Sequence, residues 1–367
     1  MDNQLLPNGV TSNHASNVNG LDMHYLEAGH DNEAVLLLLH GFPELSYSWR
    51  DVMPSLAQAG FRVIAPDQRG YGETTGWTDR YDDGFDDCRM TNLVRDAMGL
   101  LHVLGVPQVK SVIGHDFGSP VAAWCALMRP DIFTSVVMMS APFAGPPGIA
   151  DGVERSSEVD VHAELAKLRR PRKHYQWYYS TREANEHMWH APQGLKSLMH
   201  AYFHVKSADW SGNQPYALQA WRADQLALMP TYYIMDLNAT MAETVEAYLP
   251  SDEAAWLSEK TLEVYCANYA RTGFQGGLNW YRAATSPKFL SEYQVYSGRT
   301  IDVPSAYIAG ASDWGIYQRP GDFQRMSARA CTDMRCVALI DGAGHWVQQE
   351  QPGRVTRTLL EFLTSLD

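Results

Sequence analysis

The sequence predicts an α/β fold in which a mostly parallel sheet, with helices on both faces, is interrupted by a helical insertion. Short apolar runs alternate with amphipathic stretches as far as about residue 143, and the same alternation returns at about residue 301. Strands that alternate with helices are connected by crossovers, which produce a parallel sheet covered on both sides. Residues 144–300 lack strand-like runs and are rich in Tyr, Trp, His and Met.

Apolar runs that are too short for helices and end in turn residues are predicted to be buried strands. They are Ala34–Leu39, Arg62–Ala65, Val109–Ile113, Ser135–Met139, Pro304–Ala309 and Cys336–Ile340. Stretches with helical periodicity are Trp49–Gln58, Met90–Leu104, Pro120–Met128, Val161–Leu168, Tyr216–Leu228, Glu253–Arg271 and the closing helix Arg354–Leu366. We therefore expect a core of residues 20–143 and 301–367, with residues 144–300 as an inserted helical cap, or lid. Residues 1–19, which are rich in Asn and Ser, are expected to form a flexible extension.

The amino-acid composition disfavours several classes of function. The chain has 367 residues, 45% of them hydrophobic and 19% charged, with a net charge of -13. This acidic balance disfavours nucleic acid and anionic lipid as partners. No window approaches about 18 uninterrupted apolar residues, so no membrane span is expected. The N-terminus has neither the basic region nor the apolar region of a secretory signal, so secretion is not expected.

The five cysteines are an odd number and are widely spread along the chain. This pattern favours free thiols in a reducing compartment, so we expect a cytoplasmic protein. Cys331 and Cys336 have neither the spacing of a zinc site nor that of a redox pair.

No metal or organic cofactor is expected.

A candidate nucleophile lies at the turn Gly114-His115-Asp116-Phe117-Gly118, between the run Val109–Ile113 and a predicted helix. A tight strand-to-helix turn with small residues on both sides presents its central side chain as a nucleophile, which is Ser in most hydrolases. Here the central residue is Asp116, and Asp tolerates the positive φ of such a turn. On its own this short motif also fits an ordinary turn with a helix-capping aspartate.

Other motifs supply the partners that this turn needs. The segment His40-Gly41-Phe42-Pro43-Glu44 follows the first predicted strand of the core, and its Phe42 N–H is expected to form an oxyanion hole with that of Phe117. Asp313, in Gly310-Ala311-Ser312-Asp313-Trp314, and His345, in Gly342-Ala343-Gly344-His345-Trp346, follow later strands. The order nucleophile, acid, base is the order of an α/β-hydrolase core.

An aspartate nucleophile indicates which kind of substrate carbon is attacked. When a carboxylate attacks a saturated carbon, the product is an ester that water can hydrolyse, whereas a serine would form a stable ether. The carboxylate is ionised at neutral pH without a base, so the histidine remains available to activate water. Asp116 therefore indicates epoxides or alkyl halides as substrates.

The motifs HGFPE (40–44), GYGET (70–74), GHDFG (114–118) and GAGHW (342–346) resemble those of the soluble epoxide hydrolases of the α/β-hydrolase superfamily, over about residues 20–367. Dehalogenases with an aspartate nucleophile share these core motifs. Two cap segments, HYQWYY (174–179) and GLNWYR (277–282), resemble those that carry the paired tyrosines of epoxide hydrolases. The resemblance implies that Tyr175 and Tyr281 donate a proton to the epoxide oxygen, with Tyr232 or Tyr233 as the alternative to Tyr175. We expect Trp177, Trp280 and Trp346 to contact the substrate.

The predicted function is therefore that of an epoxide hydrolase acting on a small apolar epoxide and water. Asp116 would form an alkyl ester, water activated by His345 would hydrolyse it, Asp313 would orient His345, and a vicinal diol would leave. A haloalkane or haloacid dehalogenase with the same core is the alternative. A second alternative is a binding or biosynthetic protein of this fold that does not hydrolyse its ligand. A monomer and a homodimer both remain open.

Overall fold

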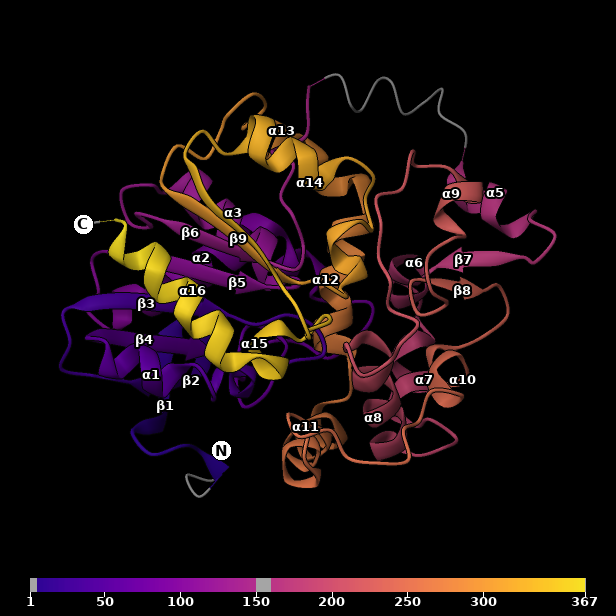
Figure 1. Cartoon of the computed structure of the whole chain (residues 1–367), viewed down its shortest axis with the longest axis horizontal. Coiled ribbons are helices and arrows are strands. Elements are labelled where there is room, and N and C mark those ends of the chain that lie inside the picture. Colours follow the sequence, from indigo (N-terminus) through magenta and orange to yellow (C-terminus); the bar gives the residue numbers. More distant parts are fainter. Residues whose placement is uncertain (1–4, 150–159, 367) are drawn as a thin grey trace.

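An eight-stranded sheet forms the centre of the computed structural model, which describes residues 5–149 and 160–366 (Figure 1). Its two antiparallel pairs lie at one edge, and the remaining pairs are parallel. In order across the sheet the strands are β1 (Val10–Val18), β2 (Leu21–Ala28), β4 (Phe61–Pro66), β3 (Ala34–Leu39), β5 (Ser111–His115), β6 (Val136–Met139), β9 (Ser305–Gly310) and β10 (Met334–Ile340). The predicted α/β class is confirmed.

Helices cover both faces of the sheet because alternate residues of its strands point to opposite sides. In β3, Leu36 and Leu38 join one apolar cluster and Leu37 and Leu39 join the other. Each fully buried leucine contributes about 1.5–3 kcal/mol relative to an exposed one. The first cluster is closed by α1 (Met53–Gln58) and α16 (Pro352–Thr364), and the second by α2 (Met90–Val103) and α3 (Gly118–Met128).

Between β6 and β9 the chain leaves the sheet, and most of this inserted region forms the layer at the right of Figure 1. Its elements are α5 (Val161–Ala166), β7 (Arg172–His174), α6 (Tyr175–Tyr179), α7 (Ala184–Trp189), α8 (Leu195–Lys206), α9 (Ala223–Leu226), β8 (Ile234–Asp236), α10 (Met241–Glu246), α11 (Glu259–Thr272), α12 (Gln275–Thr285) and α13 (Leu290–Gln294). The remaining helices are α14 (Asp322–Arg325) and α15 (Val347–Glu350), with short 3-10 or π segments at Ser46–Trp49, Phe85–Cys88, Pro287–Phe289, Trp314–Ile316 and Met326–Ala330.

Two expectations about this inserted region are wrong. Only Ala223–Leu226 of the predicted helix Tyr216–Leu228 is helical, and Tyr216 and Leu228 are about half exposed, so the apolar pattern does not mark one buried helix face. The region also contains the antiparallel pair β7–β8, whose three-residue strands are too short to give a periodic signal.

The expected flexible extension is also wrong for Val10–Val18, which form the edge strand β1 paired with β2. Val10, Ala15 and Val18 are buried, whereas most of the intervening polar residues are exposed or half-buried. An edge strand that faces solvent carries this polar composition, which hides its strand character in the sequence. Residues 1–4 of the predicted extension and 150–159 of the predicted cap lie outside the described residues.

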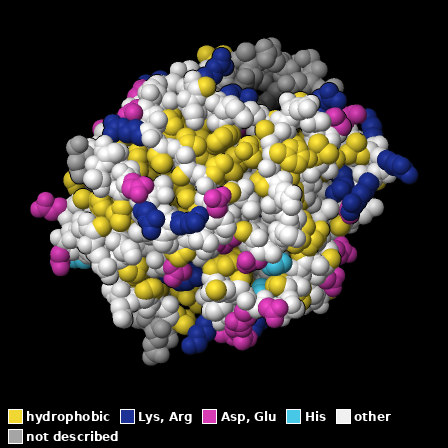
Figure 2. All heavy atoms as spheres, in the orientation of Figure 1, with side chains coloured by type: hydrophobic (Ala, Val, Ile, Leu, Met, Phe, Trp, Pro, Cys, Tyr) yellow, Lys and Arg dark blue, Asp and Glu magenta, His cyan; other side chains and the backbone are white. Residues whose placement is uncertain are grey.

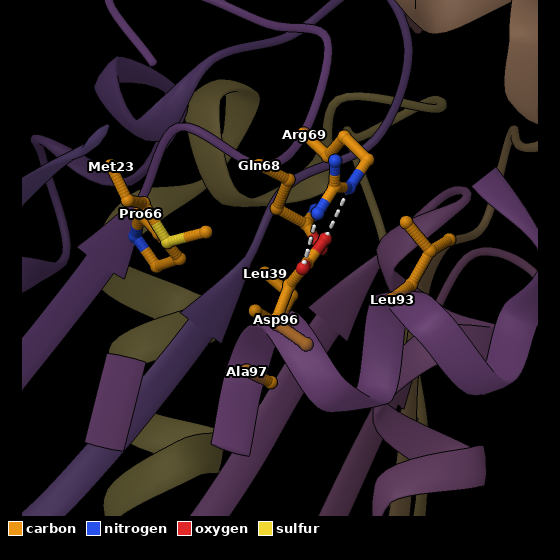
Figure 3. A pocket seen from close by; sticks show the side chains of 8 residues that line it. All are labelled: Met23, Leu39, Pro66, Gln68, Arg69, Leu93, Asp96 and Ala97. Carbon is orange, nitrogen blue, oxygen red and sulfur yellow. Dashed lines mark hydrogen bonds and ion pairs between the residues drawn. The ribbon is translucent and has the colours of Figure 1, made fainter. Parts of the chain in front are cut away.

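A buried ion pair joins the loop after β4 to α2. The Arg69 guanidinium donates two hydrogen bonds of 2.7 Å to the carboxylate of Asp96, and the pair lines a small pocket that includes Met23 and Leu93 (Figure 3). Bidentate geometry of this kind satisfies both charges away from water. The pocket shares no lining residue with the cluster around Asp116, so we assign the ion pair a role in packing.

Acidic and basic side chains are mixed over the face of the molecule shown in Figure 2. Among the described residues, no helix is both long enough and apolar enough to cross a bilayer.

Candidate active site

Asp116 lies at the sharp turn between β5 and α3, with a φ of 51°. The two flanking glycines are required by close backbone contacts: a Cβ on Gly114 would lie 2.0 Å from the Gly118 oxygen, and one on Gly118 would lie 2.2 Å from the Leu39 oxygen. Aspartate is one of the few residue types that adopts a positive φ at modest cost. The strained turn therefore presents the Asp116 carboxylate at the carboxyl end of the sheet.

The structure brings Asp116, His345 and Asp313 together from loops after three different strands. Nε2 of His345 lies 3.1 Å from Oδ2 of Asp116, and Nδ1 lies 3.0 Å from Oδ1 of Asp313. All three side chains are buried. Because Nδ1 faces the Asp313 carboxylate, Nε2 is directed to Asp116 and the space beside it.

Asp313 is itself fixed by two further donors. Its Oδ2 accepts a 2.5 Å hydrogen bond from the Ser140 hydroxyl, and its Oδ1 accepts one of 2.7 Å from the Gly315 N–H. The Ser140 hydroxyl also lies 3.0 Å from Nδ1 of His345. The acid and the imidazole therefore have little freedom to rotate.

The charges of this cluster shift its pKa values in directions that suit a nucleophile and a base. Burial raises the pKa of Asp116, but the hydrogen bond and charge of His345, together with the charge of Lys206, lower it by more, so the carboxyl stays ionised. Burial and Lys206 lower the pKa of His345, but the carboxylates of Asp313 and Asp116 raise it above its usual range. Asp116 and Asp313 are therefore both favoured in their ionised, carboxylate form.

A backbone donor approaches the same carboxylate from the loop after β3. The Phe42 N–H donates a 2.9 Å hydrogen bond to Oδ1 of Asp116. Gly41 makes this approach possible, because a Cβ at that position would lie 2.3 Å from the Asp116 Cβ. The Phe117 N–H remains the predicted second donor.

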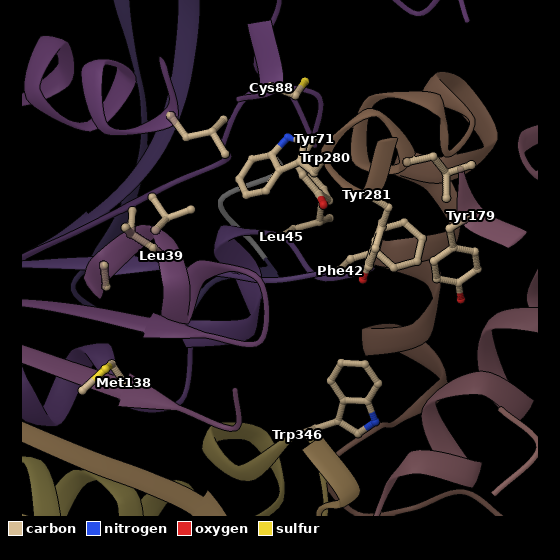
Figure 4. Close-up of a cluster of buried hydrophobic side chains, with 14 of the residues drawn as sticks. Leu39, Phe42, Leu45, Tyr71, Cys88, Met138, Tyr179, Trp280, Tyr281 and Trp346 are labelled. Atoms are coloured by element: carbon tan, nitrogen blue, oxygen red, sulfur yellow. The ribbon is translucent and has the colours of Figure 1, made fainter. Parts of the chain in front are cut away.

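Aromatic side chains from the inserted region cover the turn. The Tyr281 ring, on α12, lies 5.5 Å from that of Phe42 and 5.2 Å from that of Phe117, as centroid distances. Figure 4 shows Tyr281 beside Phe42 and Tyr179. The Tyr175 ring, on α6, lies 5.9 Å from the Tyr281 ring. The two predicted phenols are therefore neighbours, and the Asp116 charge acts on both.

The two phenols differ in their hydrogen bonds. The Tyr175 hydroxyl donates to Oε1 of Gln318 and accepts from Nε2 of Gln176, both at 3.1 Å. The Tyr281 ring lies among other aromatic rings, 5.0 Å from that of Tyr179 as a centroid distance. Burial, followed by the charge of Asp116, raises the pKa of both phenols well above the ordinary value, so both retain their protons.

The rival tyrosines lie in the same aromatic layer. The Tyr232 hydroxyl donates a 2.5 Å hydrogen bond to Oδ1 of Asn213, which occupies it as a donor. The Tyr233 ring lies 5.2 Å from that of Tyr175.

The three predicted substrate-binding tryptophans have other partners. The indole N–H of Trp280 donates to the Arg69 carbonyl at 2.9 Å, and that of Trp346 donates to the Phe203 carbonyl at 2.8 Å. The Trp177 ring packs against His162, with centroids 3.6 Å apart. The Trp280 ring nevertheless lies 5.2 Å from that of Phe117, and the Trp346 ring lies 4.6 Å from that of His345, as centroid distances. Contact of the three tryptophans with substrate stays a prediction.

Several buried polar residues near the cluster were not predicted from the sequence. Glu44 and His115 form a 2.6 Å pair behind the turn, and both lie inside motifs that already drew attention. Ser140 has a φ of 68°, and Lys206 is buried with its ammonium over the rings of Tyr202, Tyr233 and Trp346; neither belongs to a sequence pattern. Within the described residues no three His, Cys, Asp or Glu side chains are arranged to bind a metal.

Comparison with known proteins agrees with this fold. The family described as the α/β hydrolase fold matches residues 34–352. Epoxide hydrolase A of Mycobacterium tuberculosis is 32% identical over 98% of this chain and 99% of its own length. Among solved structures, an epoxide hydrolase from an endophytic Streptomyces has a TM-score of 0.78 at 28% identity, covering 98% of this chain and 97% of that one. Epoxide hydrolase A from Mycobacterium thermoresistibile has a TM-score of 0.77 at 31% identity, covering 96% and 98%. The chain therefore belongs to the α/β hydrolase fold family and, within it, to the epoxide hydrolases.

Proposed function

We propose that this protein adds water to an epoxide and releases a vicinal diol, through a covalent ester on Asp116. One observation carries the proposal: the Asp116 carboxylate lies 3.1 Å from the imidazole of His345 and beneath the aromatic pair that includes Tyr281. A nucleophile for the first step, a base for the second and a proton donor are thus available in one buried cluster.

In the first step the carboxylate of Asp116 attacks one carbon of the epoxide ring. The bond from that carbon to the ring oxygen breaks, and Tyr281 or Tyr175 donates its phenolic proton to the departing oxygen. The product is a glycol monoester of Asp116. The protonated phenols, whose pKa values burial raises, are available as donors across the neutral range.

In the second step His345 takes a proton from a water molecule, which attacks the ester carbonyl carbon. Asp313 and Ser140 orient the imidazole for this transfer. Phe42 and Phe117 N–H groups stabilise the oxyanion, at about 2.7–4 kcal/mol for each donor. The acyl C–O bond then breaks, and the departing alkoxide takes the proton that stayed on the former water oxygen, so the diol leaves and Asp116 regains its carboxylate. The proton taken by His345 returns through solvent to the phenolate.

We assign residues 144–300 the role of a lid, because both phenols come from this region while the other reacting groups come from the core. Phe42, Phe117 and Tyr179 surround Tyr281, and this apolar lining favours a small apolar epoxide.

Dehalogenation is the weaker candidate. A departing halide needs hydrogen-bond donors, and the indole N–H groups of Trp280 and Trp346 are already bonded to backbone carbonyls. A pair of buried tyrosines is unnecessary for a leaving group that departs as a stable anion.

A single turnover in ¹⁸O-labelled water tests the covalent route. With enzyme in excess over styrene oxide, one label should enter the Asp116 carboxyl group and the diol should stay unlabelled, because water attacks the ester carbonyl and not the substrate carbon. Peptide mass spectrometry locates the label. Label that appears directly in the first diol would exclude the ester, and halide release without diol formation would favour a dehalogenase.

Removing the phenols tests the proton donors. We expect Tyr281→Phe and Tyr175→Phe each to slow ester formation by about 10- to 100-fold, and the double variant by about 10³-fold or more. Stopped-flow measurement of ester formation separates this step from hydrolysis. Tyr248→Phe is the control, since the Tyr248 hydroxyl contacts Thr231 in the inserted region. If Tyr232→Phe slows ester formation and Tyr175→Phe does not, the assignment of the first phenol is wrong.

A further inference from the structure

The carboxylate of Glu350 binds both sides of the loop that carries His345. Its Oε2 accepts a 2.8 Å hydrogen bond from the Gly344 N–H, and its Oε1 accepts one of 2.9 Å from the Trp346 N–H. Oε2 also accepts a 2.8 Å bond from the Ala208 N–H, in the segment that follows α8 in the inserted region. One carboxylate therefore connects the base-bearing loop to the inserted region.

The same segment of the inserted region also contacts His345 itself. The His345 N–H donates a 2.9 Å hydrogen bond to the Lys206 carbonyl. The two backbones pack so closely that a Cβ on Gly344 would lie 2.5 Å from the carbonyl carbon of Ser207. Three consecutive N–H groups of the loop, 344 to 346, are thus bound by Glu350 or by the inserted region.

These contacts act on the backbone of His345, whereas Asp313 and Ser140 act on its ring. A base that takes a proton from water must stay within a few tenths of an ångström of its working position, because misplacement by about 1 Å can cost roughly 10²-fold in rate. The His345 carbonyl also lies 2.7 Å from Nε2 of His115, so Glu350 adds the contacts to the two N–H groups on either side of His345.

We propose that Glu350 is a positioning residue for His345, and that its carboxylate makes the hydrolysis of the ester dependent on docking of segment 206–208 against the loop. This inference rests on the proposed function, since it concerns only the second chemical step. Among the described residues the Glu350 carboxylate is hydrogen-bonded to Ala208, Gly344 and Trp346, and to neither Asp116 nor the phenols, so ester formation is expected to proceed without it.

The three hydrogen bonds require the ionised carboxylate. A protonated carboxyl carries an O–H on one oxygen, and that oxygen is then a poor acceptor for the N–H it faces. Burial raises the pKa of Glu350 to about 7 against the lowering effect of the three N–H groups, and the charge of Asp209 adds to the rise. The other charged groups on the segments bonded to Glu350 are Lys206 and His345.

The Glu350→Gln variant of the full chain tests this inference. Rapid-quench single turnovers of styrene oxide, from about pH 5.5 to 9, give the rates of ester formation and ester hydrolysis separately. We expect ester formation within about two-fold of wild type and hydrolysis slower by about 10- to 100-fold at pH 8. In wild type, hydrolysis should fall at acidic pH with two ionisations, His345 and Glu350, whereas the variant should show only one.

Glu361→Gln, on the exposed side of α16, is the matched control and should leave both rates unchanged. Unchanged hydrolysis and an unchanged acid limb in Glu350→Gln would overturn the inference. If Glu350→Gln does not fold, Glu350→Asp gives the same readout: slower hydrolysis with normal ester formation supports the positioning role, and equal loss in both steps overturns it. A wild-type enzyme that forms no ester with epoxides would instead refute the proposed function.

Discussion

Replacing Asp116 with asparagine should lower epoxide turnover by about 10⁴- to 10⁶-fold, the range found when a catalytic nucleophile is removed. A neutral amide does not attack the ring carbon, so neither the ester nor the diol can form. Asparagine also adopts a positive φ, so the strained turn at 51° should survive the change. Steady-state diol formation measures the loss, and an unchanged thermal transition shows that the fold is retained.

The control for this variant is Asp131→Asn, which changes an exposed carboxylate shortly after the end of α3. Its turnover should match wild type. Deamidation of the introduced asparagine would restore the nucleophile, so intact-mass analysis of Asp116→Asn must show that the side chain is still an amide. A variant that keeps more than about one tenth of wild-type activity without deamidation would show that Asp116 is not the nucleophile.

Replacing His345 with glutamine should separate the two chemical steps. Ester formation needs only the ionised Asp116 and a phenol, so one equivalent of epoxide should react rapidly. Hydrolysis loses its base, which we expect to slow turnover by about 10²- to 10⁴-fold. The protein should then gain the mass of the epoxide, and a peptide digest should locate the adduct on Asp116.

His190→Gln is the control, because His190 is exposed in the inserted region, where its ring lies 3.7 Å from the Glu186 carboxylate and stacks on Trp189. It should show neither an adduct nor a loss of rate. If His345→Gln turns over at the wild-type rate with no adduct, another group activates the water.

The sequence predicts some elements better than others for physical reasons. The run Ala34–Leu39 is predicted to the residue because a central parallel strand is buried on both faces and therefore uniformly apolar. The strand Val10–Val18 is missed because an edge strand with one solvent-facing side resembles a polar extension. The helix predicted over Tyr216–Leu228 is wrong because apolar residues at helical spacing there are partly exposed.

The residues of the candidate site also differ in how well the sequence alone predicts them. Asp116 follows β5 directly, and Asp313 and His345 lie in the loops just after β9 and β10. Chain order and local turn chemistry therefore suffice to nominate them, and the structure brings them within hydrogen-bonding distance. Tyr175 and Tyr281 were implied by resemblance, because the inserted region holds many aromatic residues with no spacing that distinguishes these two.

The α/β core, the hydrolase fold and the aspartate at its turn can all be predicted from the amino-acid sequence. These follow from local constraints: apolar periodicity, glycines at close contacts and one side chain at a positive φ. The groups that orient the base, in contrast, become visible only in the folded protein. Glu350 reaches Ala208 across 142 positions of the chain, and Ser140 reaches His345 across 205. Such hydrogen bonds depend on the docking of distant segments, which leaves no periodic or spacing signal in the sequence.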